Sequence, residues 1–173
     1  MRTRRIKNGF TLVEIIVVLG IIGVLTSILT ANFMQARQDA RNKTMRTELR
    51  EVQLALELYR AQNKQYPPTG GSYPTNLKNV LVPEYIPDLP DATDSRNANC
   101  TLTYTADVAG TYYKLTAARC VEGVAAAATG VQIDDEFARC PSFCGTCTSN
   151  SYVQTDPQFY ESLAVYSAGG QCQ

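Results

Sequence analysis

The most constraining feature of this chain is a long apolar segment close to its N-terminus. Between Phe10 and Met34, a stretch of 25 residues, the only formally charged side chain is Glu14. A helix needs about 20 apolar residues to cross a bilayer. Four cations lie within residues 1–9, with no acid among them. Positively charged flanks stay in the cytoplasm, so the pattern predicts a membrane helix at residues 10–34 with residues 1–9 inside and the C-terminal bulk outside.

This segment differs from an ordinary secretory signal. Such signals have an apolar stretch of roughly 7–15 residues, followed by a small residue at the cleavage site. Here the small residue, Gly9, comes before a longer stretch. A cut after Gly9 would remove residues 1–9 as a leader and keep the apolar segment as an anchor. It would also create an α-amine on Phe10, with an ordinary pKa of about 8.

Glu14 has two interpretations. The first is an acid near the membrane surface that contacts lipid headgroups. The second pairs its carboxylate with the Phe10 amine, one helical turn away, of its own chain or of a neighbouring chain. A buried ion pair between chains would set their register in an assembly.

The residues Lys7-Asn8-Gly9-Phe10-Thr11-Leu12-Val13-Glu14 resemble the N-terminal signature of type IV prepilins and type II secretion pseudopilins. The resemblance implies cleavage between Gly9 and Phe10 by a prepilin peptidase, and N-methylation of Phe10. It also implies that Glu14 meets the N-terminal amine of a neighbouring subunit in a filament. The similarity is close over residues 1–34 and extends in character to about residue 63.

Residues 35–63 are expected to continue the helix. No Pro or Gly interrupts them, and strong helix formers dominate. An apolar stripe recurs at spacings of three and four residues, which places it on one helix face. Its members are Met45, Leu49, Val52, Leu56 and Tyr59. We therefore predict one helix from about Phe10 to Gln62, whose second half packs on the protein's own globular domain.

Residues 64–173 are predicted to form that exported globular domain. Tyr66-Pro67-Pro68 ends the long helix, and a short helix is expected at Leu77–Leu81. Two segments of alternating pattern predict a β-hairpin at about residues 100–120, with Ala109-Gly110 in its turn. Val124–Ala128 is either a short helix or a loop. The last 35 residues contain few apolar side chains and are expected to be rich in loops.

The six cysteines all lie beyond residue 99, on the predicted exterior, where thiols oxidise. They are Cys100, Cys120, Cys140, Cys144, Cys147 and Cys172. Cys100 and Cys120 would lie near the two ends of the hairpin. For the other four we favour disulfides that hold the C-terminal region together, and the alternative is a Cys₄ zinc site.

Composition excludes several functions. The chain has no histidine, which excludes histidine-dependent catalytic triads and histidine-ligated metals. No catalytic constellation is visible, so we predict a protein that is not an enzyme. Formal net charge is zero, and nothing indicates nucleic-acid binding.

Two acid clusters could bind calcium, although we favour solvated loop acids and predict no cofactor. They are Asp88, Asp91 and Asp94, and Asp134-Asp135-Glu136.

The expected fold is α+β and pilin-like: a long N-terminal helix, transmembrane in its first half, packed on a small antiparallel sheet with a disulfide-bonded C-terminal region. The main functional prediction is the homopolymeric subunit of an extracellular type IV pilus that serves adhesion, motility or DNA uptake. The disulfide-rich region favours it. A type II secretion pseudopilin is the alternative, favoured by the proline-punctuated loop. The second alternative is a single-pass membrane protein that has an exported binding domain and does not polymerise. Assembly would also need machinery in the membrane.

Overall fold

The computed structural model describes most of the chain. The described residues are 9–69, 73, 75–91, 93–94, 97–140 and 156–172, without the side chains of residues 28–32, 93 and 94. They contain one long helix, α1, and a small sheet with short helices around it. The α+β, pilin-like fold predicted from the sequence is confirmed.

Helix α1 runs from Leu12 to Asn63 and has 52 residues, which confirms the predicted continuous helix. Its end follows from local chemistry. Lys64 has a left-handed backbone conformation (φ 66°), and its N–H donates to the carbonyl oxygen of Arg60 at 2.7 Å. A left-handed residue directly after the last turn is a common helix stop. Pro67 and Pro68 follow, and neither has the N–H that a helix interior requires.

The chain divides into two compact units, Met1–Gln38 and Asp39–Gln173. In the first unit, the apolar side chains of α1 between Leu12 and Leu25 are exposed to solvent in a single copy. Within the described residues, no helix combines the length and the apolar character needed to cross a membrane.

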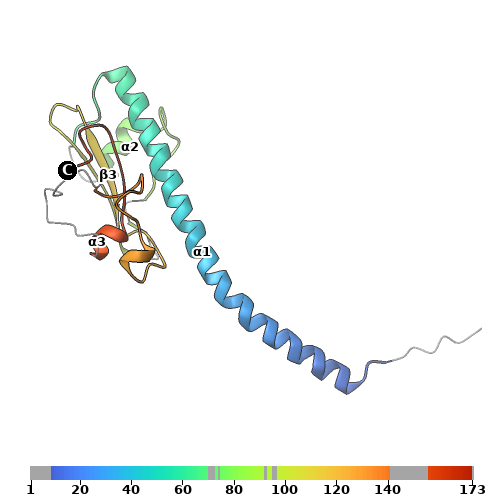
Figure 1. Cartoon of the computed structure of the whole chain (residues 1–173). Coiled ribbons are helices and arrows are strands. Elements are labelled where there is room, and N and C mark those ends of the chain that lie inside the picture. Colours follow the sequence, from blue (N-terminus) through green and yellow to red (C-terminus); the bar gives the residue numbers. More distant parts are fainter. Residues whose placement is uncertain are drawn as a thin grey trace, which may run out of the picture. The chain divides into compact units, whose positions relative to one another are not determined.

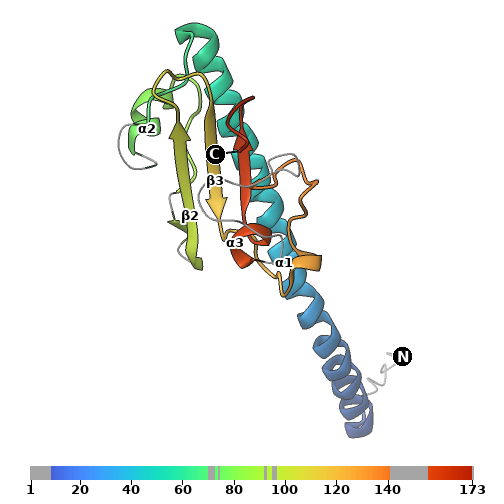
Figure 2. The same ribbon diagram turned by 60° about the vertical axis from the view of Figure 1, so that its left-hand side comes forward.

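The second unit contains a four-stranded antiparallel sheet in the order β1-β2-β3-β4. Figure 2 shows β2 and β3 side by side, and Figure 1 shows β3 from another direction. The strands are β1 (Thr93–Asp94), β2 (Asn97–Ala106), β3 (Tyr113–Ala118) and β4 (Leu163–Tyr166). Strands β2 and β3 form the predicted hairpin, with Leu102 opposite Ala117 and Ala106 opposite Tyr113. Gly110 lies in the turn with a φ of 64°, a conformation that glycine adopts without steric cost.

One hydrophobic core joins α1 to this sheet. The α1 residues Leu49, Val52 and Leu56 are fully buried and belong to one cluster with Tyr113 and Leu115 of β3. Met45 and Tyr59, at the ends of the stripe, are partly buried against the same core. The prediction that this stripe packs on the globular domain is therefore confirmed. Helix α2, Thr75–Leu81, contains the predicted short helix and buries Leu77 and Leu81.

The C-terminal region contributes more apolar side chains to the core than the sequence suggested. Phe159 of α3 (Pro157–Tyr160) and Leu163 and Val165 of β4 are buried in the common core. Strand β4 pairs with β3 and completes the sheet. The expectation of a loop-rich tail with few apolar residues missed this strand, because four residues are too short for a clear alternating pattern. Val124–Ala128 is also mostly loop, with a single 3₁₀ turn, η1, at Ala127–Thr129.

Candidate functional site

The residues predicted for processing lie at the start of α1. Gly9 and Phe10 precede the helix, and both are exposed. A Cβ added at Gly9 would meet nothing within 4 Å, and Phe10 is 81% exposed. A bond that lies outside regular structure, between two exposed residues, is accessible to a peptidase. The processing of this bond stays a prediction.

Thr11 and Glu14 form a reciprocal cap on the first turn of α1. The Glu14 N–H donates to the Thr11 hydroxyl oxygen at 3.3 Å. The Glu14 carboxylate in turn accepts from the Thr11 N–H and the Thr11 hydroxyl, both at 3.4 Å. This is the capping box, in which a Ser or Thr and a Glu three residues later satisfy backbone donors that the helix leaves open.

The sequence contained the signal for this cap, the pattern Thr-x-x-Glu ahead of an apolar run. Our sequence analysis overlooked it and considered Glu14 only as a partner for headgroups or an amine. The capping bonds are long and exposed, so Glu14 remains accessible to a stronger donor. Its pairing with a Phe10 amine after cleavage stays a prediction.

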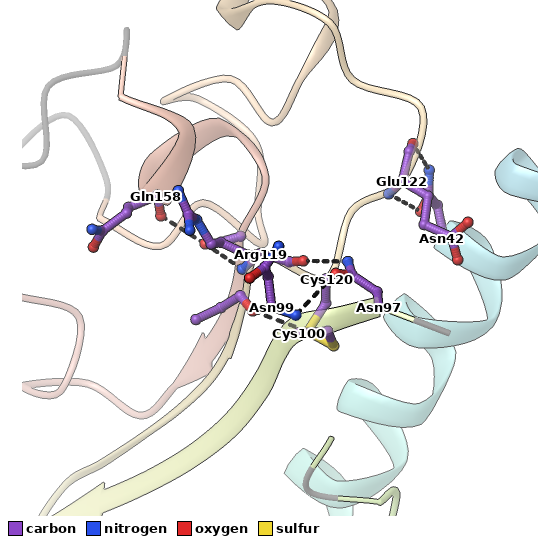
Figure 3. The surroundings of a disulfide bond; sticks show 10 residues. Asn42, Asn97, Asn99, Cys100, Arg119, Cys120, Glu122 and Gln158 are labelled. Atoms are coloured by element: carbon purple, nitrogen blue, oxygen red, sulfur yellow. Dashed lines mark hydrogen bonds between the residues drawn. A yellow bond between two sulfur atoms is a disulfide. The ribbon is translucent and has the colours of Figure 1, made fainter. Parts of the chain in front are cut away.

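A second set of contacts holds the segment after β3 against the second half of α1. The Arg41 guanidinium forms two hydrogen bonds to the Glu122 carboxylate. The Asn42 side chain donates to the Glu122 carbonyl and accepts from the Glu122 N–H, both at 2.9 Å, as Figure 3 shows. The Arg46 guanidinium binds both oxygens of Asp135 at 2.9 and 2.7 Å. This segment is thus fixed to α1 by paired charges.

The ring of Phe137 lies close to two arginines of α1, Arg46 and Arg50. The guanidinium carbons of Arg46 and Arg50 are 5.0 and 5.1 Å from its ring centroid, within the range of cation–π attraction. Arg50 also pairs with Glu136. The hydrogen bonds from Arg46 lower the pKa of Asp135 below its ordinary value. Sequence reasoning missed these contacts, because their partners lie more than 80 positions apart.

The cysteines are oxidised wherever the structure describes them. Cys100 and Cys120 form a disulfide that joins the first half of β2 to the segment directly after β3 (Figure 3). Cys140 and Cys172 are also disulfide-bonded, which excludes a zinc site that uses them as thiolates. Cys144 and Cys147 lie outside the described residues. Near the Cys100 bond, the Asn97 amide donates to the carbonyl of Arg119 at 2.9 Å.

The candidate calcium ligands whose side chains the structure describes are not gathered into one site. Asp88 pairs with Lys78 at 3.0 Å and accepts from the Leu89 N–H. Asp91 is exposed, and the side chain of Asp94 lies outside the described residues. In the second cluster, Asp135 and Glu136 are paired with arginines. Over the part of the chain that the structure describes, no group of three or more such side chains could hold a metal ion.

Comparison with known proteins identifies the N-terminal segment. Residues 4–30 match the model of the prokaryotic N-terminal methylation motif. The range includes the predicted cleavage site, the capping box and most of the apolar segment. Over this segment the chain is similar to the prepilin and pseudopilin family. The members of this family are structural subunits and not enzymes.

Several curated relatives of this chain carry the name type II secretion system core protein G, each from a different organism. The protein from Escherichia coli (strain K12) is 38% identical over 69 residues, covering 40% of this chain and 48% of the relative. The protein from Klebsiella pneumoniae is 38% identical over 63 residues, which cover 36% of this chain and 45% of the relative. The protein from Dickeya chrysanthemi is 35% identical over 79 residues, which cover 46% of this chain and 52% of the relative. The chain thus spans about half the length of these relatives, and no solved structure matches it.

Proposed function

We propose that this chain is a pseudopilin-type subunit of a filament that serves protein secretion. The observation that carries the proposal is the 38% identity to type II secretion system core protein G. Our sequence analysis ranked a type IV pilus subunit first, and these relatives favour its alternative. The change concerns the role of the filament, because both interpretations predict the same N-terminal chemistry.

The proposed mechanism begins in the membrane. The subunit is stored in the inner membrane through residues 10–34, with the globular domain outside, and a prepilin peptidase removes residues 1–9. The exposed apolar side chains between Leu12 and Leu25 support this storage, because such a surface needs lipid or other helices to cover it. Membrane-bound assembly machinery then moves the helix from lipid into a bundle of identical helices.

Glu14 supplies the register in this mechanism. Its carboxylate exchanges the long contacts with Thr11 for the charged Phe10 amine of a neighbouring subunit. The charged amine adds ion pairing to the hydrogen bond, whereas the Thr11 donors are neutral and lie at 3.4 Å from the carboxylate oxygen, so the exchange is favourable. Subunits that meet head to tail and are displaced along the axis at each step form an open filament and not a closed ring.

A type IV pilus subunit remains a second candidate. The observation that favours it is the disulfide-bonded C-terminal region, with the Cys100–Cys120 bond and oxidised Cys140 and Cys172. Such bonds suit a domain exposed on a long surface filament, where oxidising conditions preserve disulfides.

Deletion of the gene from its native host distinguishes the two functions. For the pseudopilin function we expect exported proteins to accumulate inside the cell envelope, while surface filaments are unchanged. The unmodified gene should restore export, and a Glu14→Ala variant should not. Loss of surface filaments with normal export would instead support the pilus function. If neither export nor filaments change, both proposals are wrong.

A further inference from the structure

The face of α1 opposite the core carries two exposed leucines. Leu54 is 62% exposed and Leu58 is 47% exposed, although the stripe at Leu49, Val52 and Leu56 is fully buried. At 100° per residue, Leu54 lies roughly opposite that stripe. This outward face, defined by the exposed residues Ala40, Lys43, Thr47, Glu51, Leu54, Leu58 and Ala61, has no cover in a single copy.

Most of the outward face suits close contact with another helix. Ala40, Thr47, Leu54 and Ala61 recur every seven residues, so they form one line along the helix. The Thr47 hydroxyl donates to the carbonyl oxygen of Lys43 at 3.1 Å. Its polar group is therefore satisfied within the helix and does not need water.

Two charges interrupt this face, and they have opposite sign. Lys43 and Glu51 are both exposed. Neither enters an ion pair or a side-chain hydrogen bond with the residues that the structure describes. Nearby charges differ in this respect, because Arg46 and Arg50 pair with Asp135 and Glu136. Lys43 and Glu51 are thus available to a partner.

These two side chains cannot satisfy each other within one helix. They are eight residues apart, which is about 12 Å along the axis and about 80° around it. They therefore lie on two flanks of the outward face, with Leu54 between them in angle. A second α1 that runs parallel, displaced by the same eight residues, would place one Lys43 beside the other Glu51.

We propose that the outward face of α1 binds a second copy of this chain, with Lys43 of one copy paired to Glu51 of the next. The inference rests on the proposed filament function and names the contact that sets the axial step, about 12 Å. The same displacement brings Leu58 of the second copy beside Arg50 of the first, whose long aliphatic stem can cover a leucine.

The position of the charges on two flanks makes this contact open-ended. A copy that uses Lys43 toward one neighbour still presents Glu51 toward another. Repetition of such a head-to-tail contact gives a filament. The apolar side chains supply the contact area, and the charge pair selects the register, which is the usual division between apolar and charged groups at an interface.

A zero-length cross-link tests the pair in the unmodified protein. A carbodiimide joins an amine to a carboxylate with loss of water, and only where the two groups touch. Membranes and sedimentable polymers are treated separately, and the linked peptides are identified by mass spectrometry. We expect an amide between Lys43 and Glu51, which must join two chains because of their separation in one helix. Glu84, an exposed glutamate outside α1, should give no link to Lys43.

Charge reversal tests whether the pair matters for assembly. Lys43→Glu and Glu51→Lys should each lower polymer yield about fivefold or more, since each places like charges together. The double variant should recover to within about twofold of the unmodified chain, because it restores the pair with its signs exchanged. Glu84→Lys makes the same change in net charge as Glu51→Lys and should leave the yield unchanged.

The outcomes separate this inference from the proposed function. Polymers that form without the link, and that both single reversals leave at the unmodified level, overturn the Lys43–Glu51 contact and leave the filament function standing. The link without any polymer supports the contact and contradicts the filament function. Absence of both polymer and link in the unmodified protein overturns both proposals.

Discussion

Replacing Glu14 with alanine should stop assembly while the subunit remains in the membrane. Glu14 has two roles, and the structure allows them to be separated. In a single copy it caps α1 through Thr11, with both accepted hydrogen bonds at 3.4 Å. In the proposed bundle it neutralises the Phe10 amine of a neighbour. Removal of the acid should slightly raise membrane affinity, because a charged group near the apolar segment is lost.

The two roles differ in size. Loss of a helix cap costs about 1 kcal/mol. A buried charge left without its partner costs about 3–5 kcal/mol. Each 1.4 kcal/mol is a tenfold change in an equilibrium constant, so loss of the cap lowers subunit addition about fivefold and loss of the pair lowers it about a hundredfold or more. Thr11→Ala removes the side-chain part of the cap and keeps the carboxylate, which makes it the matched control.

The assay compares polymer yield with the amount of subunit in the membrane. We expect Glu14→Ala to give almost no polymer at an unchanged membrane level, and Thr11→Ala to give a modest decrease. Glu14→Gln should fall between them, since its amide oxygen still accepts a hydrogen bond from the amine. If Thr11→Ala and Glu14→Ala reduce the yield equally, the cap and not the charge is what assembly needs. Unmodified yield with Glu14→Ala would refute the register argument altogether.

Three further predictions concern processing and stability. The mature chain should begin at Phe10 with one added methyl group, and intact-mass measurement of the exported protein tests this. A mass that corresponds to a chain starting at Met1 would contradict the prediction. Replacing Cys100 and Cys120 by serine should lower the free energy of unfolding by about 3 kcal/mol, because the bond closes a loop with a sequence separation of 20; an unchanged urea midpoint for the full chain in detergent would show that the bond is not stabilising. Arg46 lowers the pKa of Asp135, so the stability from this pair is present above the ordinary carboxyl pKa of about 4 and lost as pH falls through the lower folded pKa. Arg46→Met should therefore destabilise the protein by about 1 kcal/mol at neutral pH, and the gap from the unmodified protein should narrow below about pH 4; a gap that stays constant down to pH 2 would mean that the pair contributes nothing.

The features read from the sequence are those that depend on neighbouring positions. The continuous helix followed from an unbroken run of helix formers, and it ends at Asn63, ahead of the Tyr66-Pro67 stop. The β2–β3 hairpin followed from two alternating segments around Gly110. The apolar stripe at Leu49, Val52 and Leu56 predicted which face of α1 would be buried. The capping box at Thr11 and Glu14 is equally local, and recognition of its pattern would have found it.

The tertiary structure decided what depends on distant positions. Strand β4 is four residues long and becomes recognisable only through its pairing with β3. The arginines of α1 have their carboxylate partners 81 to 89 positions away, and no local pattern records such a distance. Lys43 and Glu51 show the same limit: in the sequence they are two ordinary charges of a helix. The structure shows that the neighbouring arginines are paired with carboxylates and that the opposite face of α1 is buried. Lys43 and Glu51 are therefore recognised as exposed charges on the same face as Leu54.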